Sequence, residues 1–188
     1  MVARIEKYLD EVSKLVLKVP SEAVERVASL IFEAYRSGKR VFVFGNGGGS
    51  STSAHFVCDL AKGTISEGKP RLKAISLAQN MPLLTAWAND TDYTNTFGEQ
   101  LKNLVEKGDV VIGLSGSGMS PNVINAFHVA NDAGAVSVLL SGFDGGAALR
   151  VAADAIVVPS SDMQQIEDVH MILTHIIFRC LKREIAEA

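Results

Sequence analysis

The stretch that most constrains this chain is residues 41–59, which has the pattern of a strand, a glycine-rich loop and a helix. The apolar run Val41–Phe44 is typical of a strand covered on both faces. Four of the next five residues are glycine, which lets the backbone adopt positive φ and approach a ligand closely. Hydroxyl residues at 50–53 follow where the helix begins, and free N–H groups at a helix N-terminus attract phosphate. The segment therefore predicts a phosphate-binding loop.

A second segment repeats this pattern at residues 110–121. The apolar run 110–114 predicts another buried strand, and Ser115-Gly-Ser-Gly-Met-Ser120 follows it. Ser120 suits the N-cap of a helix and Pro121 its first position. One such loop alone is compatible with an ordinary strand–helix turn, whereas two in one small chain favour a shared ligand.

From residue 40 onward, strand and helix patterns alternate, which predicts an α/β fold with parallel strands and right-handed crossovers. We expect a three-layer αβα sandwich of the flavodoxin-like type around a five-stranded parallel sheet. The expected strands lie near 41–44, 73–77, 110–114, 136–140 and 155–158, and the expected helices near 51–61, 82–88, 96–106, 121–133, 145–151 and 163–185. In the strand order 2-1-3-4-5, a ligand binds between strands 1 and 3 at their carboxyl ends. Because the two loops follow those strands, both are expected to serve one site.

Two amphipathic helical patterns precede the sheet. Pro20 separates them and Gly38 ends the second. We expect a helical hairpin over residues 1–38 and an αβα core over 39–188, together forming a single domain of 188 residues. Part of the apolar stripe of the hairpin is expected to be buried against another subunit.

Composition argues against several classes of protein. The net charge of −3, without a basic patch carrying interleaved aromatic residues, argues against nucleic-acid binding. No apolar run reaches transmembrane length, and the N-terminus lacks a signal-peptide core, so we expect no membrane association. Cys58 and Cys180 form no motif, and we interpret them as buried thiols in a reducing compartment. We therefore expect a cytoplasmic protein.

Other nucleotide and hydrolase motifs are absent from the sequence. Ser50 stands where a dinucleotide fingerprint requires its third glycine, and the second expected strand is not followed by an acidic residue. There is no Gly-Lys-Ser/Thr phosphate loop and no Gly-x-Ser-x-Gly nucleophile turn.

Acid–base residues accompany the first loop. His55 and Asp59 are four residues apart and share one helix face. Alternative interpretations are a histidine packed in the core and a solvated pair between Asp59 and Lys62. Later in the chain, Glu167 and His175 are eight residues apart, on nearly the same face of the last helix. His175 has a core-packing alternative too.

Several segments together resemble the SIS (sugar isomerase) domain family over essentially the whole chain, and most of all its phosphoheptose isomerase branch. They are Gly45-Asn-Gly-Gly with its serines, His55 and Asp59, Ala86-Trp-Ala-Asn-Asp90, Ser115–Ser120, Glu167-Asp-Val-His170 and His175. The resemblance implies isomerisation of sedoheptulose 7-phosphate to D-glycero-D-manno-heptose 7-phosphate through an enediol, for heptose and cell-envelope carbohydrate biosynthesis. It also implies a homotetramer.

The resemblance assigns roles to residues of this chain. Asp59 is the implied catalytic base and His175 the implied catalytic acid. The implied metal is zinc, with another divalent cation also compatible with nitrogen and oxygen ligands. The implied metal ligands are His55, Asp59, Glu167 and His175, and the implied substrate and phosphate contacts are Asn46, Gly47, Gly48, Ser50, Ser51, Asn89, Asp90, Ser115, Gly116, Ser117, Ser120 and Glu167.

Three positions depart from the family pattern. Gly49 stands where the family has a serine, Asp59 where it has a glutamate, and Glu167 where it has a glutamine. These departures keep two alternatives open, an isomerase of another sugar phosphate and a non-catalytic SIS domain that binds a sugar phosphate or a protein. Asn89-Asp90 also has a simpler interpretation as the turn that ends a helix.

Overall fold

The structure, a computed structural model, describes residues 1–188 and contains one five-stranded parallel sheet. Its strand order is β2-β1-β3-β4-β5, which confirms the expected topology. The strands are β1 (Arg40–Gly45), β2 (Lys73–Ser76), β3 (Val110–Ser115), β4 (Val136–Ser141) and β5 (Asp154–Val157). Each differs from its predicted range by at most one residue at either end.

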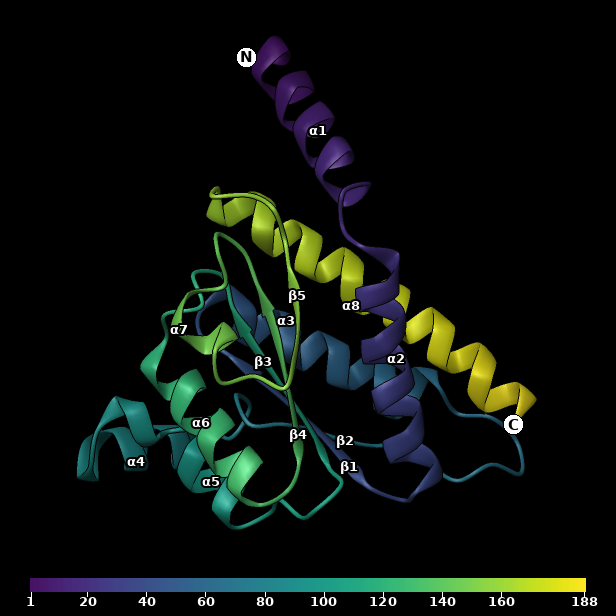
Figure 1. Cartoon of the computed structure of the whole chain (residues 1–188), viewed down its shortest axis with the longest axis vertical. Helices are drawn as coiled ribbons and strands as arrows, with labels where there is room; N and C mark the ends of the chain where they lie inside the picture. The colour runs from purple at the N-terminus through teal and green to yellow at the C-terminus, as the bar shows by residue number, and fades with distance from the viewer.

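Helices cover both faces of the sheet and confirm the three-layer architecture (Figure 1). The helical elements are α1 (Val2–Val16), α2 (Ser21–Arg36), α3 (Gly48–Cys58), the π-helical turn η1 (Asp59–Gly63), α4 (Met81–Asp90), the 3₁₀ turn η2 (Tyr93–Asn95), α5 (Gly98–Lys102), α6 (Pro121–Asp132), α7 (Gly146–Leu149) and α8 (Met163–Glu187). Helices α2, α3 and α8 pack against one face, while α5, α6 and α7 pack against the other.

Strand β1 explains how one apolar run serves two cores. Val41 and Val43 belong to the core beneath α2, α3 and α8, whereas Phe42 and Phe44 belong to the core beneath α5 and α6. All four side chains are fully buried. Because successive side chains of a strand point to opposite faces, a central strand needs apolar residues at every position.

The two N-terminal helices form as expected, but they do not fold back on each other as a hairpin. Helix α2 packs against α8, and α1 continues away from the body of the molecule (Figure 1). Helix α1 is attached to α8 instead, where Tyr8 Oη donates to Asp168 Oδ2 at 2.6 Å and Gln165 Nε2 donates to Glu11 Oε2 at 3.1 Å. The carboxylate of Asp168 raises the pKa of Tyr8 to about 12, because it accepts the phenolic proton in a hydrogen bond.

Three further expectations need correction or comment. Of the helix predicted over 96–106, only the short α5 forms, with η2 before it and turns after it. Cys58 and Cys180 are exposed rather than buried, and Cys180 faces the open groove between α2 and α8. No helix is both long and apolar enough to span a membrane.

Candidate active site

The first loop connects β1 to α3 and requires glycine for steric reasons. Gly47 has φ +52° at the position before α3, a backbone conformation that favours glycine. A Cβ atom at Gly48 would collide with the carboxylate of Glu167, and one at Gly45 would lie 2.9 Å from the Leu114 carbonyl oxygen. The loop is therefore held closely against both α8 and the end of β3.

The second loop connects β3 to α6 and holds its serine hydroxyls in one small turn. Ser115 Oγ donates to Ser120 Oγ at 3.0 Å, and the backbone N–H of Met119 donates to Ser117 Oγ at 3.3 Å. Gly116 lies beneath the side chain of Met163, the first residue of α8. The N-terminal end of α8 therefore covers this loop.

The two loops lie side by side, as the strand order predicts. Gly45 pairs with Leu114 in the sheet, so the chain enters both loops at the same level. Beyond the strands, Asn46 of the first loop and Asn122 of α6 exchange two hydrogen bonds of 2.9 Å each. Backbone N–H groups and hydroxyls from two helix starts consequently share one edge of the sheet.

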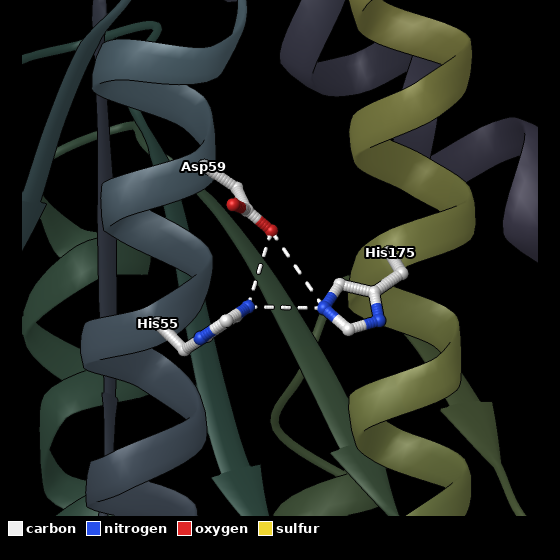
Figure 2. Close-up of side chains that lie close together, drawn as sticks. All are labelled: His55, Asp59 and His175. Carbon is white, nitrogen blue, oxygen red and sulfur yellow. Dashed lines mark hydrogen bonds and ion pairs between the residues drawn. The ribbon is translucent and has the colours of Figure 1, made fainter.

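Three chemically active side chains meet between α3 and α8 (Figure 2). His55 and His175 approach with their Nε2 atoms 3.0 Å apart. Asp59 Oδ2 lies 3.4 Å from His55 Nε2 and 3.8 Å from His175 Nε2. Both imidazoles are about half exposed, so neither is the packed core histidine of the alternative interpretation.

Helices α3 and α8 run side by side in the same direction, which brings these residues together. Glu167 lies opposite Gly48 at the start of α3, and His175 lies opposite His55 two turns later. The i,i+4 spacing of His55 and Asp59 turns both toward α8, as the helix period predicts.

Glu167 does not join the His55–Asp59–His175 group. Its carboxylate faces Gly48, at the N-terminus of α3, where the helix dipole and free N–H groups favour an anion. Of the implied ligand set, the structure brings together three members and leaves the fourth two helical turns away.

Other predicted site residues differ in their placement. Ser50 and Ser51 lie in the first turn of α3, and the Ser50 carbonyl accepts a hydrogen bond from Ser53 Oγ at 2.7 Å. Asn89 donates to Asp90 Oδ1 at 2.9 Å at the end of α4, and neither side chain hydrogen-bonds to the two loops. In this chain the pair has the geometry of a helix end, which is its simpler interpretation.

His170 is a structural histidine rather than an acid–base group. It is 2% exposed, and its Nε2 lies 3.2 Å from the Ser141 carbonyl oxygen. Burial lowers its pKa to about 4, so the ring is neutral near pH 7 and its Nε2–H donates to this carbonyl.

Sequence reasoning missed three residues beside the first loop. Tyr93, Thr96 and Asn122 form a hydrogen-bonded set around Asn46. The available signal was the position of Asn122 directly after Ser120-Pro121, in the first turn of the helix that follows the second loop. No local pattern marks Tyr93 or Thr96.

Comparisons with known proteins agree with this architecture. The model of the SIS domain family matches residues 7–142. A phosphoheptose isomerase of Geobacter sp. (strain M21) is 38% identical over 165 residues, covering 88% of this chain and 85% of that protein. A phosphoheptose isomerase of Helicobacter pylori (strain P12) is 35% identical over 176 residues, covering 94% and 91%.

A solved structure gives the same result. The phosphoheptose isomerase of Neisseria gonorrhoeae matches with a TM-score of 0.89 and 26% identity, covering 96% of this chain and 98% of that one. The chain belongs to the SIS domain family. Within that family it belongs with the phosphoheptose isomerases, as the sequence motifs predict.

Proposed function

We propose that the chain is an aldose–ketose isomerase that converts sedoheptulose 7-phosphate into D-glycero-D-manno-heptose 7-phosphate. The observation that carries the proposal is the His55–Asp59–His175 group, which forms between α8 and the helix that follows the first of two paired glycine–serine loops. The named activity of relatives at 35–38% identity supports the same reaction.

The two loops bind the phosphate in this proposal. The N-termini of α3 and α6 supply N–H groups, and Ser115, Ser117 and Ser120 supply hydroxyls. Gly49 stands where the family has a serine, and in this proposal Ser50 and Ser51 supply the missing hydroxyl. Asn46, Gly47, Gly48 and Gly116 line the same loops, and Asn89 and Asp90 remain proposed contacts at the sugar end.

Asp59 and His175 move the protons. Asp59 removes a proton from carbon 1 of the ketose and returns it to carbon 2 of the enediol. His175 donates a proton to the oxygen on carbon 2, and it takes back the proton that the hydroxyl on carbon 1 releases as the aldehyde forms. The number of protons is unchanged, as an isomerisation requires.

The same three side chains fit a divalent metal ion. The distances of 3.0, 3.4 and 3.8 Å between their ligand atoms define a triangle whose centre lies about 2 Å from each, the length of a zinc–nitrogen bond. We propose zinc, held by His55, Asp59 and His175, with another divalent cation as the alternative. When bound, the ion supplies Lewis acidity that polarises the substrate carbonyl.

Glu167 has a separate role in this proposal. Because its carboxylate faces Gly48 at the start of α3, it is suited to accept hydrogen bonds from sugar hydroxyls near the first loop. Asp59 is one methylene shorter than the glutamate of the family pattern, and its contacts with both imidazoles place the carboxylate between α3 and α8.

Exposed apolar surface supports the proposal of a homotetramer. Val2, Ile5 and Leu9 of α1 are exposed, at 67%, 53% and 63%. A groove of about 670 Å³ between α2 and α8 is lined by apolar side chains that include Phe32 and Ile176. Surfaces of this kind are typical of subunit interfaces. A cytoplasmic location is also part of the proposal.

The test is an assay of the metal-loaded protein with sedoheptulose 7-phosphate, in which NMR detects the aldose product. We expect turnover, a loss of at least about 100-fold in kcat for His175→Ala because general acid catalysis contributes that much, and a loss of activity with a chelator. His128→Ala is the matched control, because His128 is exposed on α6 and makes no contact with the site.

Each outcome has a distinct meaning. Turnover that survives chelation would remove the metal from the proposal. Metal binding without turnover would favour another sugar phosphate. Tight binding of the sugar phosphate with neither turnover nor metal would favour a non-catalytic binding domain.

A further inference from the structure

A closed set of hydrogen bonds joins the two loops through the side-chain amides of Asn46 and Asn122. Asn46 Nδ2 donates to Asn122 Oδ1, and Asn122 Nδ2 donates to Asn46 Oδ1, each at 2.9 Å. Asn122 is 1% exposed, so water does not compete for these bonds. A buried residue of α6 therefore holds the side chain of a first-loop residue 76 positions earlier in the chain.

Thr96 fixes which way the Asn122 amide points. Thr96 Oγ1 donates its only hydrogen to the Tyr93 carbonyl oxygen at 2.9 Å. It is therefore left to accept, and Asn122 Nδ2 donates to it at 3.2 Å. If the Asn122 amide were turned over, its oxygen would face Thr96 Oγ1 with no hydrogen between the two atoms. This arrangement is costly because both residues are buried and water cannot satisfy either oxygen.

Tyr93 completes the set on the exposed side of Asn46. Its hydroxyl donates to Asn46 Oδ1 at 2.9 Å. Oδ1 thus accepts from both Tyr93 and Asn122, which uses its two lone pairs. One hydrogen of Asn46 Nδ2 goes to Asn122, and the second is the only hydrogen of the two amides that no protein group accepts.

We propose that Asn122 is a positioning residue for substrate binding, which with Thr96 fixes the Asn46 amide so that the first loop offers an N–H rather than an oxygen to the sugar phosphate. Phosphate oxygens only accept hydrogen bonds, so an amide turned the other way would repel them. The inference rests on the proposed function, because it assigns the substrate to the loop that carries Asn46.

Two substitutions of Thr96 separate orientation from packing. Thr96→Val keeps the shape and removes the acceptor for Asn122, whereas Thr96→Ser keeps the hydroxyl. We expect Thr96→Val to raise KM for sedoheptulose 7-phosphate about three- to tenfold, the range one neutral hydrogen bond supports, with kcat within about twofold. Thr96→Ser is expected to restore KM to near the wild-type value.

Asn131→Ala is the matched control, because Asn131 lies on α6, the helix that carries Asn122. Asn131 Nδ2 donates to the Val151 carbonyl oxygen and Asn131 Oδ1 accepts from Ser137 Oγ, so the variant also loses two hydrogen bonds. It has no contact with Asn46, and its KM is expected to match the wild type. A purely structural role of Thr96 would lower the melting temperature of Thr96→Val and leave its KM unchanged, which would overturn the inference.

A second measurement uses the wild-type protein and does not depend on the folding of any variant. In NMR spectra of the Asn46 side chain, one Nδ2 proton is expected to exchange slowly with water and the other rapidly. Sedoheptulose 7-phosphate is expected to shift the rapidly exchanging proton. Saturating ligand that shifts neither proton would overturn the inference while leaving the isomerase intact.

The two proposals fail in different ways. A ligand-induced shift at Asn46 without turnover would overturn the isomerase and support the positioning role. Turnover with an unchanged KM in Thr96→Val would overturn the positioning role alone. If the wild type neither turns over nor binds sedoheptulose 7-phosphate, both proposals are overturned.

Discussion

At the scale of single residues, the buried His170 gives stability a defined dependence on pH. Its folded pKa of about 4 is below the ordinary value of 6.5, so between these two values the unfolded chain binds more protons than the folded one. Stability therefore decreases as pH falls from 6.5 toward 4. We expect this residue alone to contribute a loss of about 3 kcal/mol across that range, measured by urea unfolding.

The control for this prediction is a second histidine. In His170→Gln the amide can still donate to the Ser141 carbonyl but does not titrate, so the pH dependence between 4 and 6.5 should become shallower. His128→Gln, at an exposed position, should keep the wild-type slope. If the stability of His170→Gln depended on pH as steeply as that of the wild type, His170 would not be the source of the pH dependence.

Two glycines with nearly the same φ test what holds the second loop in place. Gly38 has φ +67° with open space around it, and Gly118 has φ +66° with the Gly145 carbonyl where a Cβ would lie. We expect Gly38→Ala to cost about 1 kcal/mol through strain alone. Gly118→Ala should cost at least about 3 kcal/mol, because strain and collision add.

Denaturant midpoints of both variants check this prediction. Equal losses would mean that the loop around Gly118 moves aside without cost. A larger loss of stability in Gly118→Ala than in Gly38→Ala, together with a raised KM, would instead show that substrate binding depends on the position of the second loop.

At the scale of elements, α8 organises the site. Its first residue covers Gly116, Glu167 faces Gly48, and His175 reaches the side chains of α3. One helix therefore contacts both loops and supplies a member of the three-residue group. A shift of α8 would disturb the proposed phosphate site and the proposed proton-transfer group together.

At the scale of the whole molecule, α1 is a helix whose apolar side is left exposed in a single chain. Ile5 and Leu9 are exposed on its apolar side, so in a monomer their replacement by glutamate should change stability little. In the proposed tetramer the same double substitution buries charge and should dissociate the assembly. Light scattering should give a fourfold mass for the wild type and a smaller species for Ile5→Glu/Leu9→Glu.

Lys7→Glu is the matched control for this experiment, since it changes the charge of α1 by the same amount on its exposed polar side. It should remain tetrameric. Circular dichroism of the double variant should retain its helix content, and a tetramer that persists in that variant would contradict a role of α1 in assembly.

The sequence by itself determined the five strands, the two loops and the shared face of His55 and Asp59. Each follows from periodicity or turn chemistry within a few residues, because a buried strand, a glycine turn and a helix repeat are local properties. The family motifs added His175 to this group, 120 residues away from His55.

Only the tertiary structure decided the rest. Glu167 faces Gly48 instead of joining the two histidines, α1 extends away instead of forming a hairpin, and Cys58 is exposed. The Asn46–Asn122 pair also appears only in three dimensions. The physical reason is common to all four, since each depends on which surfaces of distant elements meet, and no local pattern of side chains encodes that.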